Sequence, residues 1–190
     1  MRVALFTRWP EPGKAKTRLL PALGAGGAAD LHRRLTERTV ATVLASGLAC
    51  EVRSTGAPVA VFEAWLSPLR RNDILRVVDQ GGGDLGARLA RAAEGLPVLL
   101  IGADCPDLTP AHLLAAAAAL ASAPAVIGPA EDGGYWLLGL GEPAPVFDGI
   151  DWGGPRVFAQ TLARLPTPPV VLETLADLDW PEDLARWPDL

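Results

Sequence analysis

The segment from residue 97 to residue 109, PVLLIGADCPDLT, decides the expected fold. Its first half, PVLLIG, is a continuous apolar run, which is typical of a parallel strand covered on both faces. Thr109 and Pro110 then fit the start of a helix, with threonine as the N-cap and proline at the first helical position. Asp104 lies between the two elements, directly after the strand. This order predicts a parallel sheet that binds ligands at the carboxyl ends of its strands.

The same alternation runs through the rest of the chain. Apolar runs predict strands at 2–6, 49–54, 74–78, 97–102, 125–128, 135–140 and 170–173. Helical patterns cover 22–46, 58–68, 84–94, 109–121 and 154–165, and a short helix starts at Pro181. We therefore expect an α/β sandwich with a mostly parallel central sheet and helices on both faces. A length of 190 residues fits a single domain over 1–190.

Charge and composition narrow the choice of partners and compartment. The formal net charge is −5, so neither nucleic acid nor an anionic membrane is an expected partner. The chain carries only Cys50 and Cys105 and shows no secretion signal or long apolar span, so we expect a cytoplasmic protein. His32 and His112 fall inside helical patterns, and we expect surface or capping roles for them.

A cationic loop follows the first strand. Residues 7–18 read TRWPEPGKAKTR, and four of the residues between 8 and 18 are lysine or arginine. Such side chains beside a helix N-terminus suit a phosphate chain, and Gly13 allows close backbone approach. The loop matches neither the Walker pattern nor GxGxxG. Either it is a solvated basic loop, or it binds a nucleotide through Thr7, Arg8, Gly13, Lys14, Lys16 and Arg18.

Carboxylates follow the central strand and recur near the C-terminus. Asp104 is well placed for Mg²⁺, which takes one or two protein carboxylates plus substrate phosphates. The alternative is that Asp104 and Asp107 only cap turns. In ADLDWPEDL, residues 176–184, Asp179 is a candidate second metal ligand, unless it only orders a turn.

A glycine-rich segment, IGPAEDGGY, occupies residues 127–135. Its Asp-Gly-Gly core is a strong turn signal, so a plain hairpin is one interpretation. The other is a floor for a second substrate, with Glu131 and Asp132 pointing at that molecule. Trp9 and Trp152 lie close to the expected site along the chain.

Six motifs together resemble one bacterial family. They are PEPGKAKTRL (10–19), QGGGDLGARL (80–89), GADCPDLT (102–109), GPAEDGGYWLLGL (128–140), IDW (150–152) and DLDWPEDL (177–184). The chain resembles the glycosyltransferase-like proteins called transferase 1, rSAM/selenodomain-associated, which are related to 2-phospholactate guanylyltransferase. That family lies in the nucleotide-diphospho-sugar transferase superfamily, so the resemblance implies a GT-A fold.

The resemblance also implies roles for individual residues. The loop with Lys14, Lys16 and Arg18 would hold nucleotide phosphates, and Gln80 and Asp84 would lie near the base or sugar. Metal ligation of Mg²⁺ or Mn²⁺ would fall to Asp104 and Asp179, although Trp180 replaces the threonine that usually caps the following helix. The acceptor would face Glu131, Asp132, Gly133, Gly134 and Trp152.

The expected activity is metal-dependent transfer from a nucleotide-activated donor to a small-molecule acceptor. We expect Asp104, Asp132 and Lys16 to carry the catalysis, with Asp132 as proton acceptor and Lys16 as a stabiliser of negative charge. Glycosyl transfer from an NDP-sugar is the first hypothesis. The alternatives are nucleotidyl transfer from an NTP to a phosphorylated or acidic metabolite with release of pyrophosphate, and a nucleotide-binding module without catalysis.

Overall fold

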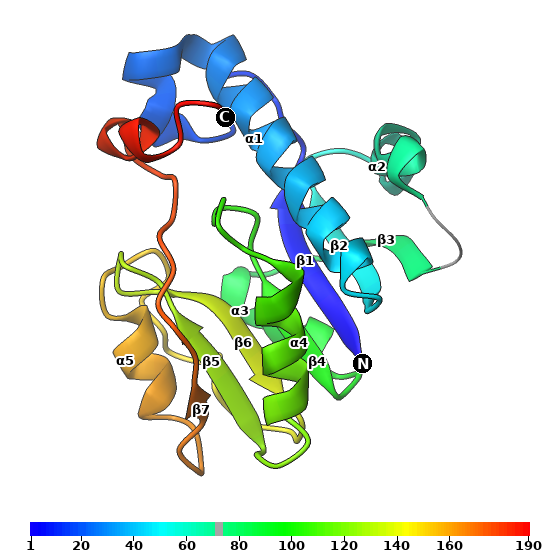
Figure 1. The fold of residues 1–190 in the computed structure, drawn as a ribbon, viewed down its shortest axis with the longest axis vertical. Helices are drawn as coiled ribbons and strands as arrows, with labels where there is room; N and C mark the ends of the chain where they lie inside the picture. The colour runs from blue at the N-terminus through cyan, green and yellow to red at the C-terminus, as the bar shows by residue number, and fades with distance from the viewer. Residues whose placement is uncertain (71–73) are drawn as a thin grey trace.

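The computed structural model describes residues 1–70 and 74–190 and shows a seven-stranded sheet between helices (Figure 1). The strands are β1 (Arg2–Arg8), β2 (Ala49–Thr55), β3 (Leu75–Asp79), β4 (Val98–Ile101), β5 (Ala125–Pro129), β6 (Tyr135–Leu140) and β7 (Val170–Val171). The α-helices are α1 (Leu20–Ala45), α2 (Val59–Leu66), α3 (Leu85–Ala93), α4 (Pro110–Ala119) and α5 (Val157–Leu162). Short 3₁₀ helices are η1 (Thr17–Leu19), η2 (Ser67–Leu69) and η4 (Pro181–Arg186).

The strand order β3-β2-β1-β4-β6-β5-β7 confirms the expected mostly parallel sheet. In the parallel block, Leu5 of β1 is in register with Val52 of β2 and Ile101 of β4. Strand β6 is the exception, because it runs antiparallel to both β4 and β5. Only residues 130–134 connect β5 to β6, and so short a connection returns the chain antiparallel, whereas a parallel return needs a dozen residues or more. The block therefore brings the ends of β1, β2, β3 and β4 to one edge.

Helices cover both faces of the sheet, as expected. Side chains alternate along each strand, so Val3 and Leu5 face one layer and Ala4 faces the other. The first layer contains α1, α2 and α4, whose residues Val40, Phe62 and Leu113 join the same buried cluster as Val3 and Leu5. The second layer contains α3 and α5, which contribute Leu89, Ala92, Phe158 and Leu162.

Local signals place several helix ends where the sequence predicts them. The hydroxyl of Thr109 accepts a hydrogen bond from the amide of His112, whose ring in turn accepts one from the Thr109 amide. Asp84 caps α3 by accepting from the amide of Ala87 at 2.8 Å. Helix α5 is shorter than the predicted 154–165, because residues before Val157 form turns.

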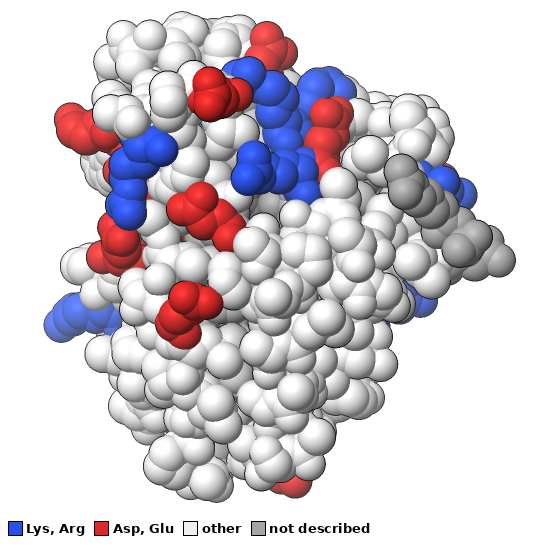
Figure 2. All heavy atoms as spheres, viewed as in Figure 1, with Lys and Arg blue, Asp and Glu red and all other residues white. Residues whose placement is uncertain are grey.

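The C-terminal segment returns to the start of α1 (Figure 1). A small apolar cluster joins Leu178 to Leu19, Leu31 and Leu35, and Trp187 packs against it. This contact holds residues 175–190 across the carboxyl edge of the sheet. On the face drawn in Figure 2, charged side chains gather on the upper half, over α1 and the C-terminal segment, and the lower half is largely uncharged. Within the described ranges, no helix combines the length and apolarity needed to cross a bilayer.

Candidate active site

Two adjoining pockets occupy the carboxyl edge of the sheet. The larger has a volume of about 540 Å³, and the smaller has a volume of about 330 Å³. We call the larger one the cationic pocket, after the lysine and arginine side chains that line it alone, and the smaller one the acidic pocket, because the charged side chains in its lining are aspartates. The two pockets share the wall formed by Phe6, Leu85, Asp104, Asp132, Gly153 and Asp179. Molecules bound in the two pockets would therefore contact some of the same side chains.

The cationic pocket collects the loop after β1. Its lining includes the predicted residues Thr7, Arg8, Lys14, Lys16, Arg18 and Gln80, together with His32 and Thr55. The end of this loop forms η1, which begins at Thr17, and α1 follows from Leu20. Lysine and arginine side chains at this place form the local positive field that a polyphosphate needs in a chain of net negative charge.

Lys16 joins the two predicted metal carboxylates. Its ammonium lies 2.5 Å from Asp104 Oδ1 and 2.8 Å from Asp179 Oδ1, and it donates to the Leu178 carbonyl at 2.7 Å. Only 5% of its side chain is exposed, and its backbone has φ 48°, in the left-handed region that favours glycine. Burial would lower the pKa of Lys16, but the two carboxylates outweigh that effect and raise the pKa. Lys16 is therefore held as an internal cation between Asp104 and Asp179.

The donor set of this site fits a hard divalent cation. Mg²⁺ and Mn²⁺ prefer oxygen ligands, and Mg²⁺ commonly takes one or two protein carboxylates plus substrate phosphates. Asp104 and Asp179 already share one cation, the Lys16 ammonium, which shows that both reach a common point. No set of three His, Cys, Asp or Glu side chains within residues 1–70 and 74–190 could hold a metal alone. Phosphate oxygens would have to complete the coordination.

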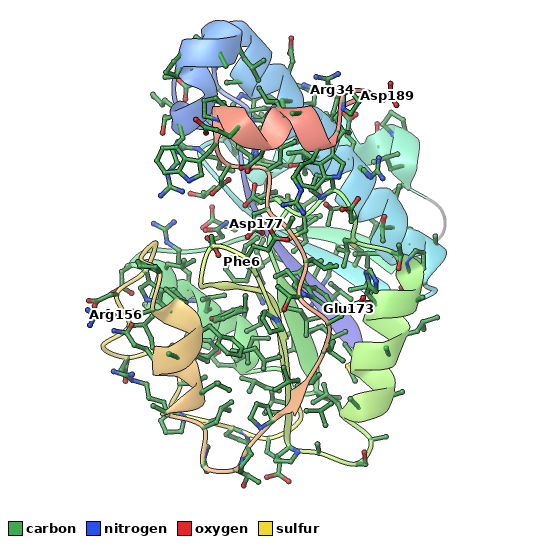
Figure 3. All side chains as sticks on the ribbon, turned by 60° about the vertical axis from the view of Figure 1, so that its left-hand side comes forward. Phe6, Arg34, Arg156, Glu173, Asp177 and Asp189 are labelled. Atoms are coloured by element: carbon green, nitrogen blue, oxygen red, sulfur yellow. The ribbon has the colours of Figure 1, made fainter. Side chains whose placement is uncertain are left out.

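The acidic pocket lies beside this ion-pair network. Asp104, Asp132, Asp177 and Asp179 line it, and its other walls come from β4, β6, α3 and α5. Asp177 and Phe6, both part of its lining, lie close together near the centre of the molecule (Figure 3). Trp152 and Gly134, both predicted for the acceptor site, also line it. Three of the five residues expected near the acceptor, Asp132, Gly134 and Trp152, therefore lie in this pocket.

Comparison with known proteins shows the family of the chain. The family DUF2064, described as an uncharacterized protein conserved in bacteria, matches residues 35–154. The chain belongs to the DUF2064 family. No curated protein matches the chain in sequence.

A solved structure places the chain in the nucleotide-diphospho-sugar transferase superfamily. A protein from Desulfovibrio desulfuricans G20, provisionally named a nucleotide-diphospho-sugar transferase, is 32% identical to this DUF2064 chain. The two structures superpose with a TM-score of 0.82, covering 95% of this chain and 84% of that one. This similarity confirms the predicted resemblance to the nucleotide-diphospho-sugar transferase superfamily.

More distant structures share the fold alone. Rv0371c from Mycobacterium tuberculosis H37Rv, solved in complex with manganese, is 18% identical with a TM-score of 0.53 over 98% of this chain and 97% of that one. CMP:2-keto-3-deoxy-manno-octonic acid synthetase, solved with CTP, is 10% identical with a TM-score of 0.53 over 97% and 95%.

The C-terminal segment of this DUF2064 chain positions the acidic side chains. The amide of Leu178 donates to the Asp104 carbonyl at 2.8 Å, which ties the segment to the loop after β4. The Asp183 carboxylate accepts from the amides of Asp179 and Trp180 at 2.9 and 2.7 Å. Asp183 thus caps η4 from inside the helix, where Trp180 offers no oxygen to do so.

Several residues that the sequence predicted for the site line neither pocket, and some of them make structural contacts instead. Gly13, Asp84, Glu131 and Gly133 do not line either pocket. Asp84 is the α3 cap, and Glu131 binds Arg186 through contacts of 2.6 and 3.1 Å. The hydrogen bond from Arg186 is the main reason that the pKa of Glu131 is lowered.

Gln80, which lines the cationic pocket, and Gly133, which lines neither pocket, both make structural contacts beside the site. The Gln80 amide nitrogen donates to the Thr7 and Arg53 carbonyls at 3.0 and 2.8 Å, and its oxygen accepts from Arg88 at 3.2 Å. Gly133 has φ +88°, and a Cβ there would lie 2.1 Å from the Pro155 carbonyl oxygen. Gln80 thus ties β1 to β2, and Gly133 packs the Asp132 turn against the loop before α5.

Two residues of the site were not predicted from the sequence. Asp177 lines the acidic pocket, and its spacing of two from Asp179 on an extended segment is the signal that places both on one side. His32, expected at the surface or at a helix cap, is buried instead. Its Nε2 lies 3.2 Å from the Thr7 hydroxyl and 3.1 Å from the Arg8 carbonyl. Burial lowers the pKa of His32, which favours the neutral ring.

Asp177 has an unusual environment. The Cys105 thiol donates to its Oδ1 at 2.8 Å, whereas Oδ2 is buried without a partner among the described residues. Burial raises the pKa of Asp177 to about 7, and the carboxylates of Asp132, Asp104 and Asp179 add to this effect. Burial and Asp177 likewise raise the pKa of Cys105, so the thiol stays protonated at neutral pH and is a poor nucleophile.

Proposed function

We propose that this chain is a metal-dependent transferase that moves a glycosyl group from an NDP-sugar to a small-molecule acceptor. The observation that carries the proposal is a pair of adjoining pockets that share Asp104, Asp132 and Asp179 and of which one, the cationic pocket, is also lined by four lysine and arginine side chains. The name of the Desulfovibrio relative and the manganese complex of Rv0371c support the donor class and the metal.

The cationic pocket would bind the diphosphate of the donor. Arg8, Lys14 and Arg18 line it, and charge-assisted hydrogen bonds from such groups are the strong ones. Lys16 would stabilise the negative charge that develops on the leaving diphosphate. A divalent cation held by Asp104 and Asp179 would neutralise further charge on the same phosphates.

The acidic pocket would hold the acceptor beside the donor sugar. The acceptor oxygen attacks the anomeric carbon, the bond from that carbon to the phosphate oxygen breaks, and the nucleoside diphosphate leaves. Asp132, in the shared wall, would accept the proton of the attacking hydroxyl. Holding both substrates in adjoining pockets lowers the entropic cost of their meeting.

Nucleotidyl transfer is the second candidate, and the density of cations favours it. Four lysine and arginine residues line the cationic pocket, and a triphosphate carries more charge than a nucleotide sugar. In that reaction the acceptor attacks the α-phosphate of an NTP and pyrophosphate leaves.

A product assay separates the candidates. The chain is incubated with NTPs and NDP-sugars in the presence of Mg²⁺ or Mn²⁺, and ligand binding is followed in parallel by thermal shift. Release of a nucleoside diphosphate supports glycosyl transfer, and release of pyrophosphate supports nucleotidyl transfer. Metal-independent nucleotide binding without turnover of any donor would indicate a binding module and would refute both reactions.

Two variants connect the assay to the site. Asp104→Ala should abolish metal-dependent turnover while the protein stays folded, because Asp104 lies beyond the end of β4. Asp189→Asn is the matched control, since Asp189 is exposed near the C-terminus and lines neither pocket. Equal activity of the two variants would place the chemistry elsewhere.

A further inference from the structure

The charged side chains that line the acidic pocket are all of one sign. The charged side chains in its lining are four aspartates, of which Asp104, Asp132 and Asp179 also line the cationic pocket, and no lysine, arginine or histidine of the described residues lines it. Asp104 and Asp179 are neutralised in part by Lys16 and Arg18. Asp132 and Asp177 form no ion pair within the described ranges; their oxygens accept from the Gly134 amide and the Cys105 thiol. Asp132 therefore presents a carboxylate that no cation of the described residues neutralises, even when Lys16 is in place.

The uncharged walls of the acidic pocket are apolar and aromatic. They include Phe6, Leu85, Leu89, Tyr135, Trp152 and Val157. Carboxylate oxygens accept hydrogen bonds from hydroxyl and amino groups, and apolar walls pack against carbon-bound hydrogens. A phosphate or carboxylate in this pocket would meet like charges without a cationic side chain to pair with.

We propose that the acidic pocket selects an acceptor that carries hydroxyl or amino groups and no anionic group. This inference rests on the proposed transferase function, because that function makes the pocket an acceptor site. It also separates the two pockets by chemistry: phosphates belong to the cationic pocket, and an uncharged or cationic molecule belongs to its neighbour. A volume of about 330 Å³ suits a molecule of monosaccharide size.

The direct test uses acceptors that differ only in charge. Glucose, glucosamine, gluconate and glucose 6-phosphate form one set, and glycerol, glycerate and glycerol 3-phosphate form another. Each is offered with the donor that is turned over, and donor consumption is measured at matched ionic strength. We expect the neutral or amino member of a set to react at least tenfold faster than its anionic members. A preference for the anionic members would overturn the inference.

Charge removal gives a second comparison. In Asp132→Asn/Asp177→Asn, the rate ratio of anionic to neutral acceptors should rise at least tenfold, even if the overall rate falls. Asp189→Asn removes the same kind of charge away from the pocket and should leave the ratio unchanged. A ratio that stays constant in the double variant would count against charge selection.

A third measurement needs no turnover and distinguishes failure of this inference from failure of the proposed function. Trp152 lines the acidic pocket, so its fluorescence, taken as the difference between the native chain and Trp152→Phe, reports the local charge. The quenching constants of caesium and of iodide are each divided by the constant for a free tryptophan amide. The normalised constant for this signal should be at least twofold higher for caesium than for iodide. If no donor is consumed, the proposed transferase function is refuted, and the quenching measurement still tests the charge of the acidic pocket. Equal or stronger quenching by iodide refutes the inference.

Discussion

Replacement of Lys16 by glutamine tests the ion-pair network at the centre of the site. The substitution removes a buried ammonium that contacts Asp104, Asp179 and the Leu178 carbonyl. Removing one partner of a fully buried ion pair costs about 3–5 kcal/mol. Here the side chains of Asp104 and Asp179 are 44% and 29% exposed, so water replaces part of the lost interaction.

We therefore expect Lys16→Gln to lower the free energy of unfolding by about 2–3 kcal/mol. For a chain of this length, each kcal/mol shifts the melting temperature by about 2–4 °C, which gives a decrease of roughly 4–12 °C. Thermal and urea unfolding measure the change. Lys14→Gln is the control, because Lys14 is 61% exposed, contacts Glu11, and should change stability by less than about 0.5 kcal/mol.

The same variant should bind Mn²⁺ more tightly. In the native chain an added cation must displace the Lys16 ammonium from Asp104 and Asp179, and a competing interaction of about 1.4 kcal/mol is worth a factor of ten in affinity. Titration calorimetry with Mn²⁺ alone should show an affinity at least tenfold higher in Lys16→Gln and unchanged in Lys14→Gln. A loss of stability below about 1 kcal/mol, together with unchanged or weaker Mn²⁺ binding, would refute the reasoning.

Three further predictions concern stability. Gly133 has φ +88°, and the Cβ added by Gly133→Ala would lie only 2.1 Å from the Pro155 carbonyl oxygen. The substitution should therefore lower the free energy of unfolding, measured in urea, by at least about 2 kcal/mol. Asp177 has a folded-state pKa of about 7 against an ordinary value of 3.8, so its contribution to stability should fall as pH rises from about 4 to 7 and then level off. Asp177→Asn should flatten that part of the stability profile, and an unchanged slope would contradict the assignment. Glu51, 1% exposed, contacts three guanidinium groups, so Glu51→Gln should cost about 3–5 kcal/mol and lower the melting temperature by roughly 10 °C, whereas a shift below 2 °C would show that the network contributes little.

Much of the fold follows from local patterns along the chain. Continuous apolar runs such as 97–102 and 125–128 are typical of buried strands, and Thr109-Pro110 marks a helix start by local chemistry. The antiparallel direction of β6 also follows from its short connection to β5, once the pairing is known. The pairing itself, which inserts β6 between β4 and β5, depends on contacts between distant strands and has no local signal.

The candidate site divides in the same way. The sequence alone determined that Arg8, Asp104 and Asp132 lie near the carboxyl edge, because Arg8 ends β1 and the two aspartates each lie three residues after the end of a strand, β4 or β5. Only the tertiary structure decided their partners: Lys16 lies between Asp104 and Asp179, although Asp179 is more than 160 residues away in sequence. It also decided that Lys16 and Arg18 pair with aspartates that line both pockets, whereas Asp177 lines the acidic pocket alone. Charge interactions depend on distance in space, and the distances between loops are set by how the sheet and the C-terminal segment pack.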